Sequence, residues 1–524
     1  MIRTTIVRTL RSSFLARTNR CVVHHTQHPG RILARCCSSQ DGKYLLHEQD
    51  GLYDHMTRGI IDEIEFDVED ICKNADSVAQ RVRDRKGEMQ EDEVYKLVDL
   101  WQERCRVKGQ VDELQEQRQA LANQGKDLKG QQNSAEFKDL QVKGRQLRKE
   151  FNEASRSETE LNSQLYNILL RLPNSCHPSV PVGDESQARL VETVGEKPAF
   201  KFVPRGHLEL GERLDILQLR HLANVSGHRS YYLKGAGAQL QHALVQFTQD
   251  RLYKQGFTPL VVPDFFYPAI LEGCGMMKSR AFDTQIYTLD STKHESLCLA
   301  GTAEVGIAGM FKDHVLRADQ LPQKAFAVST CYRAETWSGT EPHGIYRVHH
   351  FTKVEMFGVT ANDDGSESDR LQQEFLSLQK DLYSELGLCF RIIDMPTQEL
   401  GLPAHRKYDV EAWMPGRDSF GEVSSASNCT DYQSKRLHIR YETEQEELKY
   451  AHTVNATACA VPRLIILILE NFQQEDGSVV VPEALQPYMA GRKVLTVQDG
   501  LPMKYTGRER RVFKQHKKKF SKYR

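Results

Sequence analysis

The chain of 524 residues is long enough for two or more domains with substantial hydrophobic cores. Its formal net charge of −1 excludes a protein that binds polyanions through overall charge, so any contact with nucleic acid must come from local basic surfaces. No run of residues approaches the roughly 20 apolar positions that a membrane-spanning helix needs, and we expect no membrane partner.

The first forty residues differ in composition from the rest of the chain. Residues 1–40 contain seven arginines, and no aspartate or glutamate precedes Asp41. An N-terminus rich in Arg, Ser and Thr and poor in acidic residues is typical of a mitochondrial transit peptide. We therefore predict import into the mitochondrial matrix. The alternative is a disordered basic arm that contacts RNA directly.

A second unit is predicted over residues 41–171, with a coiled-coil hairpin at about 95–171. Two runs carry apolar residues at every seventh position on either side of a polar break at 123–134: Leu100, Val107, Leu114 and Leu121, then Leu140, Leu147, Ala154, Leu161 and Ile168. Few apolar residues lie off this seam, whereas a helix in a bundle needs a wider apolar stripe. The pattern favours an antiparallel coiled-coil arm over part of an ordinary bundle.

Residues 172–205 contain five prolines and are predicted to form a linker. In residues 206–492, short β-branched strands alternate with amphipathic helices and hairpins. This arrangement predicts an α+β domain on an antiparallel sheet. Because the sequence contains neither a P-loop nor a Gly-x-Gly-x-x-Gly fingerprint, a nucleotide would have to be bound by side chains on that sheet. Twelve cysteines at scattered positions give no support for a zinc site.

The C-terminal tail, residues 493–524, is strongly basic. Nine lysines and arginines lie between 508 and 524, interleaved with Phe513, Phe520 and Tyr523. Such blocks are usually disordered interaction tails, and contact with phosphates is their natural use. A tail that only increases solubility is the alternative.

Residues 331–357 are the most informative segment, and they read CYRAETWSGTEPHGIYRVHHFTKVEMF. Two runs of alternating apolar residues, 325–332 and 346–359, flank a polar loop, which predicts an antiparallel pair of strands. On an extended strand, Arg333 and Glu335 share one face.

The same alternation places Phe351, Lys353 and Glu355 on one face of the second strand. An arginine fork suits a phosphate, an aromatic ring can stack on a base, and a carboxylate can accept from an amine. If only Arg-x-Glu were present, an ordinary solvated hairpin would be the better interpretation.

The ordered run 331–357 resembles motif 2 of the class II aminoacyl-tRNA synthetases and is most similar to the seryl enzymes. Four more segments resemble family motifs in the family's order: motif 1 at 256–263, the Thr-x-Glu loop at 301–304, the Glu-x-x-Ser segment at 422–431 and motif 3 at 455–471. Segments 207–212 and 232–235 also match the seryl enzymes. The resemblance covers about 200–490, and the preceding arm fits it.

This resemblance implies the class II fold, an antiparallel sheet with flanking helices preceded by a tRNA-binding coiled-coil arm. It implies a homodimer formed through the motif 1 region at Pro263. The implied activity is that of a serine–tRNA ligase, which activates L-serine with ATP and Mg²⁺ to seryl-adenylate and transfers serine to mitochondrial tRNA(Ser). On the arm, the basic residues expected to contact tRNA are Lys126, Lys129, Arg145, Arg148 and Lys149.

The resemblance also assigns site residues. Arg333 and Arg463 correspond to the arginines at the α- and γ-phosphates and are the predicted catalytic pair. Glu422 and Ser425 correspond to the Mg²⁺ ligands. The predicted serine-binding residues are Thr302, Glu304, Glu355, Asn455 and Thr457. The predicted ATP-binding residues are Arg333, Ala334, Glu335, Val348, Phe351, Glu422, Val423, Ser424, Ser425 and Arg463.

Three other interpretations were weighed. Thr302 could simply cap a helix that has Glu304 in its first turn. A catalytically silent paralogue that binds RNA is the alternative function, but such proteins usually lose the arginines or metal ligands, which are present here. A class II ligase for another amino acid is disfavoured by the arm.

The motif 3 segment departs from the family pattern. Residues 455–463 read NATACAVPR, so three family glycines are absent and Pro462 precedes Arg463. A backbone that needed positive φ here would be strained. If the segment opens a helix, proline in the first turn is tolerable.

Overall fold

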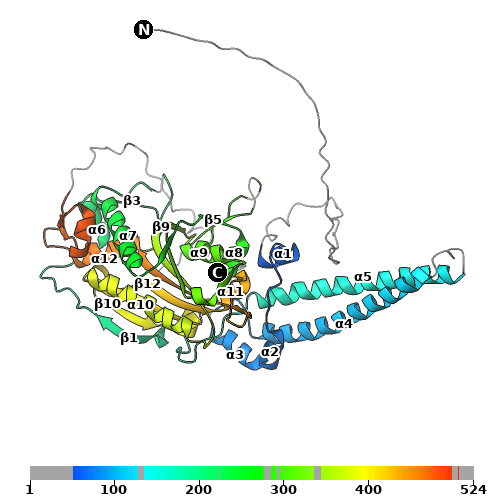
Figure 1. Cartoon of the computed structure of the whole chain (residues 1–524). Coiled ribbons are helices and arrows are strands. Elements are labelled where there is room, and N and C mark those ends of the chain that lie inside the picture. The colour runs from blue at the N-terminus through cyan, green and yellow to red at the C-terminus, as the bar shows by residue number, and fades with distance from the viewer. Residues whose placement is uncertain are drawn as a thin grey trace, which may run out of the picture. The chain divides into compact units, whose positions relative to one another are not determined.

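The computed structural model describes residues 51–497 except 86, 128–134, 223–224, 277–284, 291, 293–295 and 336–343, and it also describes residue 506. The predicted transit segment 1–40, Lys129 and the basic run from 508 lie outside the described residues. The chain divides into a unit of residues 1–46 and a unit of residues 47–524, and the fold below is that of the second unit (Figure 1).

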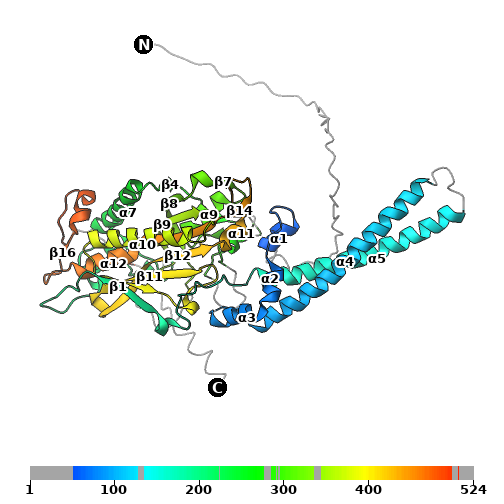
Figure 2. The same cartoon turned by 60° about the horizontal axis from the view of Figure 1, so that its bottom comes forward.

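Five helices form the N-terminal part of this unit. Three short helices, α1 (Leu52–Thr57), α2 (Val68–Lys73) and α3 (Ala75–Asp84), precede the long helices α4 (Asp92–Asp127) and α5 (Ala135–Leu169). Figures 1 and 2 show α4 and α5 side by side along their length. The side chains of α2 and α3 share a hydrophobic core with the base of this pair.

The predicted coiled-coil hairpin is confirmed. Along the middle of α4, the positions shielded from solvent alternate at spacings of three and four, as at 104, 107, 111, 114, 118 and 121. The same spacing runs through α5 at 137, 140, 144, 147, 151 and 154, and a Cβ added to Gly144 would contact Leu121 at 3.4 Å. Helix α4 continues into the predicted break as far as Asp127, so its 36 residues extend about 54 Å.

An eight-stranded sheet forms the centre of the C-terminal part, in the order β1-β10-β11-β12-β15-β9-β8-β4. Every neighbouring pair is antiparallel except β4 with β8, which confirms the predicted α+β fold on an antiparallel sheet. The strands in that order are β1 (Arg189–Val194), β10 (Phe390–Asp394), β11 (Arg406–Met414), β12 (Ser419–Thr430), β15 (His452–Ala460), β9 (His350–Thr360), β8 (Gln323–Tyr332) and β4 (Thr258–Leu260).

The predicted linker 172–205 contains a strand that the sequence did not indicate. Strand β1 pairs with β10 at one edge of the sheet, although most of its side chains are exposed. Because both faces of β1 are exposed, its sequence lacks the alternation of apolar and polar residues by which strands are predicted. The prolines of this segment therefore led to the prediction of a linker.

Two hydrophobic cores cover the sheet. The first packs the sheet against α7 (Ala236–Lys254), α10 (Glu367–Glu385) and α12 (Val461–Asn471), and the second packs it against α8 (Pro268–Gly273), α9 (Ala303–Phe311) and α11 (Tyr432–Leu437). Met356 of β9 belongs to the first core and its neighbour Phe357 to the second, so the cores lie on opposite faces. The cavity described below opens beside the second core.

Shorter elements connect these layers: α6 (His207–Arg213), β2 (Leu217–Gln218), β3 (Tyr232–Leu233), β5 (Phe265–Phe266), β6 (Cys298–Leu299), β7 (Val315–Arg317), β13 (Arg440–Glu442), β14 (Leu448–Tyr450), β16 (Val479–Val480) and β17 (Val494–Leu495). In the part of the chain that the structure describes, no helix combines the length and the apolar character that crossing a bilayer requires.

Candidate functional site

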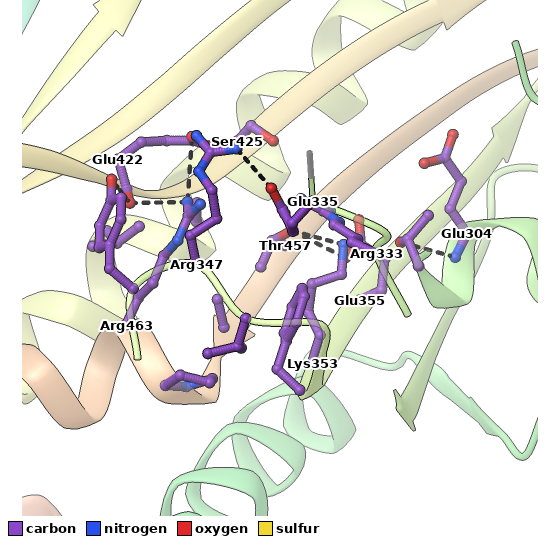
Figure 3. A pocket seen from close by; sticks show the side chains of 18 of the residues that line it. Glu304, Arg333, Glu335, Arg347, Lys353, Glu355, Glu422, Ser425, Thr457 and Arg463 are labelled. Carbon is purple, nitrogen blue, oxygen red and sulfur yellow. Dashed lines mark hydrogen bonds and ion pairs between the residues drawn. The ribbon is translucent and has the colours of Figure 1, made fainter. Parts of the chain in front are cut away.

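A cavity of about 220 Å³ lies over strands β8, β9, β12 and β15. It collects fourteen of the fifteen residues predicted for the serine, ATP and metal sites: Thr302, Glu304, Arg333, Glu335, Val348, Phe351, Glu355, Glu422, Val423, Ser424, Ser425, Asn455, Thr457 and Arg463. The exception is Ala334, whose backbone N–H donates to the carbonyl of Gln285 at 3.0 Å. Figure 3 shows Arg463 and Glu422 at one end of the cavity and Glu304 at the other.

The β8–β9 pair carries one wall of the cavity. The predicted antiparallel pairing is confirmed, with Ser329 opposite Lys353 and Ala327 opposite Glu355. The second strand begins at His350, later than the predicted 346. Phe351, Lys353 and Glu355 alternate along it and all line the cavity, as the period-two pattern predicted.

The extended geometry predicted for Arg333 and Glu335 is wrong. Strand β8 ends at Tyr332, and Glu335 has a φ of 31°, so the chain turns after Arg333. This left-handed backbone re-aims the carboxylate, which is 8% exposed and accepts from Arg347 Nη1 at 3.2 Å. Arg229 Nη1 lies 3.8 Å from the same oxygen.

Arg333 lies between the two ends of the cavity. Its Nε donates to the carbonyl of Gly301 at 3.4 Å, and its Cζ is 5.3 Å from the centroid of the Phe351 ring. The guanidinium therefore makes one long hydrogen bond and a cation–π contact, and neither saturates its five donors. It is suited to receive an anion.

A β-bulge brings Glu422 and Ser425 to the same side of β12. Residues three apart on a regular strand face opposite sides, but here Val410 pairs with Ser424 and Glu411 with Glu422. Val423 is therefore the extra residue, and it shifts the alternation by one. Both Glu422 and Ser425 line the cavity as a result.

Ser424 and Val423 contribute backbone rather than functional side-chain groups. The hydroxyl of Ser424 accepts from Gln379 Nε2 at 2.8 Å on the α10 side of the sheet. Val423 is 1% exposed and belongs to the first hydrophobic core. At the cavity, these two predicted residues therefore contribute the backbone of β12.

Arg463 enters the cavity from the first turn of α12. Its Nη1 donates to the carbonyl of Glu422 at 2.9 Å and lies 3.2 Å from the carboxylate of the same residue. Burial raises the pKa of Glu422, but Arg463, Lys407 and Arg333 together outweigh burial, so the pKa is lowered and the carboxylate is charged.

A buried acid lies on the neighbouring strand. Asp409 of β11 pairs in register with Ser425, and Lys407 Nζ is 3.1 Å from its Oδ2. Burial raises the pKa of Asp409 to about 7 despite this lysine. This pair could not be predicted from sequence, because Lys407 and Asp409 alternate as two solvated charges on a strand would.

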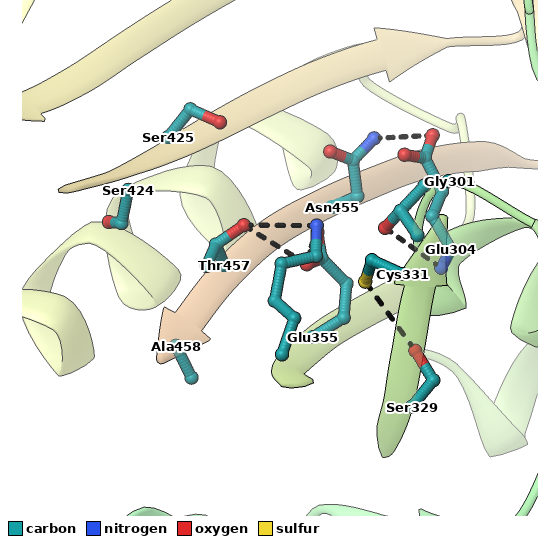
Figure 4. A network of polar contacts seen from close by, with 12 residues as sticks. Gly301, Glu304, Ser329, Cys331, Glu355, Ser424, Ser425, Asn455, Thr457 and Ala458 are labelled. Carbon is teal, nitrogen blue, oxygen red and sulfur yellow. Dashed lines mark hydrogen bonds and ion pairs between the residues drawn. The ribbon is translucent and has the colours of Figure 1, made fainter. Parts of the chain in front are cut away.

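Thr302 and Glu304 also line the cavity, and Figure 4 shows Glu304 beside Asn455. Thr302 caps α9, since its Oγ1 accepts from the backbone N–H of Glu304 at 3.3 Å, so the capping interpretation is correct and compatible with a binding role. Glu304 Oε1 accepts from Gln433 Nε2 at 2.6 Å and from Asn455 Nδ2 at 3.0 Å. Burial, reinforced by Glu355, raises the pKa of Glu304 to about 7.

Between the two ends, Lys353 and Glu355 form a buried ion pair. Lys353 Nζ lies 3.3 Å from Thr457 Oγ1, and that hydroxyl donates to Glu355 Oε2 at 3.0 Å. Lys353 balances the charge of Glu355 and belongs to the site, yet it was not among the predicted site residues. Its alternation with Phe351 and Glu355 was the available signal.

The motif 3 segment is a strand followed by a helix, not a loop that needs glycine. Residues 455–460 lie in β15, Pro462 lies in the first turn of α12, and no residue from 455 to 463 has a positive φ. The expected strain is therefore absent, while the prediction that proline is tolerated in the helix's first turn is confirmed.

The arm residues form a separate set. Lys126 on α4 and Arg145, Arg148 and Lys149 on α5 are exposed and do not line the cavity. The cavity is also lined by residues that were not predicted, among them Tyr346, Arg347 and Met276. Arg347 and Tyr346 lie within the quoted motif 2 segment, but sequence alone does not show that Arg347 pairs with Glu335.

Comparison with known proteins agrees with this geometry. The model of the tRNA synthetase class II core domain (G, H, P, S and T) matches residues 287–472, and that of the seryl-tRNA synthetase N-terminal domain matches residues 66–176. The chain is 52% identical over 487 residues to the mitochondrial serine–tRNA ligase of Mus musculus, which covers 91% of this chain and 93% of the relative. The corresponding protein of Bos taurus is 50% identical over the same shares.

Two solved structures are also similar. The seryl-tRNA synthetase from Pyrococcus horikoshii complexed with ATP has a TM-score of 0.75 and 33% identity, covering 83% of this chain and 100% of that chain. The cytoplasmic serine–tRNA ligase from Naegleria fowleri in complex with AMP has a TM-score of 0.70 and 28% identity, covering 81% and 96%.

The raised pKa of Glu304 predicts a pH-dependent effect of Glu304→Gln on stability. Because the folded-state pKa of about 7 exceeds the usual 4.5, the folded protein binds this proton more tightly. The stability it provides is present below the unfolded pKa and is lost as pH rises through the folded pKa. Glutamine stays neutral, so the melting temperature of the variant relative to wild type should rise between about pH 5 and about pH 8.

An exposed carboxylate provides the control. Glu116→Gln on α4 should show no change of its relative melting temperature with pH, because Glu116 is exposed to solvent. Equal relative melting temperatures of the Glu304→Gln protein at both pH values would contradict the assignment of the raised pKa.

Proposed function

The chain belongs to the seryl-tRNA synthetase family, and from this premise we propose how its cavity performs the reaction of a serine–tRNA ligase. The enzyme is an ATP-dependent aminoacyl-tRNA ligase that forms seryl-adenylate and pyrophosphate, then transfers serine to tRNA with release of AMP. The observation that carries the residue assignments is one cavity that holds Arg347 and Arg463 beside Glu422 at one end, Arg333 between its ends and the buried carboxylate of Glu304 at the other end.

Adenylate formation needs no general base, because the serine carboxylate is already the nucleophile that attacks the α-phosphate. The protein must position the two substrates and compensate negative charge. Arg333 lies between the two ends of the cavity, and we assign it to the α-phosphate. Its bidentate fork stabilises the charge that develops there as pyrophosphate departs.

The rest of the nucleotide is assigned to the Glu422 end. Arg463 binds the γ-phosphate, Phe351 stacks on the adenine ring, and Glu335 accepts from the adenine amino group. Arg347 and Arg229 fix the Glu335 carboxylate, which supports this last role. The strand backbone at Val423 and Ser424, together with Val348, completes the pocket.

Glu422 and Ser425 fit a Mg²⁺ ion. The bulge at Val423 turns both oxygen donors to the same side, and hard oxygen ligands suit this cation. When bound, Mg²⁺ would neutralise phosphate charge and help to hold the triphosphate. The ionised state of Glu422 supports this assignment.

Serine is assigned to the opposite end. Glu304 and Asn455 form one side of the pocket, and Glu355 with Thr457 forms the other. Glu304 and Glu355 accept from the ammonium and hydroxyl groups of serine. A site that hydrogen-bonds a substrate hydroxyl rejects amino acids without one far better than an apolar pocket does.

The enzyme functions in mitochondria, and we place it in the matrix because of the basic segment 1–40.

We also propose a homodimer formed through the motif 1 region. Exposed apolar residues surround Pro263 after β4, with Val261 fully exposed and Phe265 at 50%. Exposed apolar side chains at these positions support the proposal of an interface.

The residues that line the cavity disfavour the alternative of a catalytically silent paralogue. Proteins of that kind usually lose the phosphate arginines or the metal ligands, and here every one of these residues lines the same cavity. Serine-dependent exchange of pyrophosphate into ATP tests the proposal directly, with threonine as the competing amino acid. Absence of serine-dependent exchange at millimolar serine would refute it.

Arg333→Ala should abolish serine activation without unfolding the protein. Loss of one phosphate clamp in a site with little water costs roughly 3 kcal/mol, or more than a hundredfold in rate. The measurement is pyrophosphate exchange, with Arg317→Ala as control because that arginine is 70% exposed and paired on the surface. An exchange rate within about threefold of wild type would remove Arg333 from the site.

Glu355→Gln should raise the KM for serine at least tenfold and leave the KM for ATP within about twofold, because a charge-assisted hydrogen bond to the substrate becomes neutral. Steady-state exchange kinetics measure both constants. Glu374→Gln is the matched control, because Glu374 is a surface carboxylate of α10 that pairs with Lys324 of β8. A normal serine KM in the Glu355 variant would place serine elsewhere.

Shortening the arm should separate the two half-reactions. Leu121 faces Gly144, so a short turn joining these two positions removes residues 122–143 and keeps the helices in register. Serine activation should persist, because the cavity is built from the sheet. Transfer to tRNA should fall at least tenfold and lose part of its salt dependence.

A second variant, Arg145→Glu/Arg148→Glu/Lys149→Glu, keeps the arm's length and tests its charge alone. Charging by this variant should also fall. If activation and charging decreased together, the arm would be a folding element. Unchanged charging in both variants would assign tRNA binding to other surfaces.

A further inference from the structure

Two guanidinium groups contact the ring of Tyr346 at the end of the cavity that we assign to the phosphates. The Cζ of Arg463 is 4.6 Å from the ring centroid, and the Cζ of Arg417 is 4.7 Å from it. The tyrosine hydroxyl donates to the carbonyl of Glu422 at 3.0 Å. One half-buried side chain therefore contacts the phosphate arginine, a metal-ligand residue and a second arginine that no role above includes.

Arg417 is outside the proposed ATP pocket. It lines a smaller cavity of about 170 Å³, which shares Tyr346 with the main cavity. Arg417 lies in the turn η5 (Pro415–Arg417) before β12, and its Nη2 donates to the carbonyl of Phe420 at 3.0 Å. It connects the ring to the turn that leads into the Glu422 strand.

Helix α12 holds that turn as well. Glu470 is 3% exposed and accepts from the backbone N–H of Gly416 at 2.9 Å. Glu470 and Arg463 are seven residues apart on α12, so they lie on one face of the helix, two turns apart. The helix thus contacts the Arg417 turn at Glu470 and the Tyr346 ring at Arg463.

His207 of α6 connects Glu470 to the segment that carries Tyr346. Its Nε2 accepts from the backbone N–H of Ile345 at 3.4 Å, and its Nδ1 donates to Glu470 Oε1 at 2.9 Å. Ile345 immediately precedes Tyr346. A Cβ on Gly344 would lie 2.1 Å from His207 Nε2, so glycine is required for this close approach.

We infer that Tyr346 and Arg417 are positioning residues for ATP, in which the ring holds Arg463 toward the triphosphate and Arg417, from the smaller cavity, supports the ring. The inference rests on the proposed ATP pocket. An arginine side chain has several rotatable bonds, and stacking restricts them before the phosphate arrives.

The test compares KM values for ATP and serine in serine-dependent pyrophosphate exchange. Arg417→Met should raise the KM for ATP about fivefold and Tyr346→Leu about tenfold, with the KM for serine within about twofold in both. The double variant should be no worse than Tyr346→Leu alone, because both substitutions remove one stack. Tyr346→Phe keeps the ring and should stay within about twofold of wild type.

Arg251→Met is the matched control. Arg251 stacks on Phe247 of α7 with its Cζ 4.2 Å from the ring, and its loss should lower the melting temperature without changing either KM. If Tyr346→Leu fails to fold, Arg417→Met and direct calorimetric titration with ATP still decide the question.

Three results would overturn the inference: an unchanged KM for ATP in Arg417→Met, effects that multiply in the double variant, or equal effects of Tyr346→Phe and Tyr346→Leu. Failure of the proposed function has a different signature, since the wild-type protein itself would then show no serine-dependent exchange.

Discussion

The candidate site holds many charged side chains in a partly buried cavity, and its structure depends on pairing these charges with one another. An ion removed from water without a partner costs several kcal/mol, so each charged group must have an internal partner before substrates bind. Arg463 contacts Glu422 and the Tyr346 ring, Arg347 contacts Glu335, and Lys353 contacts Glu355. Arg333 differs, with one long hydrogen bond to Gly301 and a ring beneath it. Among the residues that the structure describes, the guanidinium assigned to the reacting phosphate thus has one hydrogen bond, to the carbonyl of Gly301.

The same constraint separates the two ends of the cavity. At the end of the cavity that we assign to serine, Glu304 accepts hydrogen bonds from the amides of Gln433 and Asn455, and burial raises its pKa to about 7. At the phosphate end, arginines lower the pKa of Glu422. A carboxylate that is partly protonated without substrate gains most from the ammonium group of an amino acid. A carboxylate that is already ionised is prepared for a cation.

Features of the fold and of the site could be predicted where a local sequence pattern produces them. The heptad seam and the alternation of Phe351, Lys353 and Glu355 are local periodicities, and the structure has both. The left-handed turn at Glu335 and the bulge at Val423 depend on partner strands, so no spacing in the sequence indicates them. Strand β1 was missed for a related reason, since an exposed edge strand has no buried face to produce a pattern.

The bulge also explains why the family resemblance identified residues that geometry would have rejected. Residues three apart on a regular strand cannot act on one ligand, so Glu422 and Ser425 would be assigned to opposite faces by alternation alone. The extra residue Val423 corrects the register, and its side chain fills the first core while Ser424 bonds to Gln379 of α10. Packing on the far face of the sheet therefore fixes the bulge, and the bulge places the two oxygen donors. The α10 core thus determines site geometry through the sheet, without contacting a substrate.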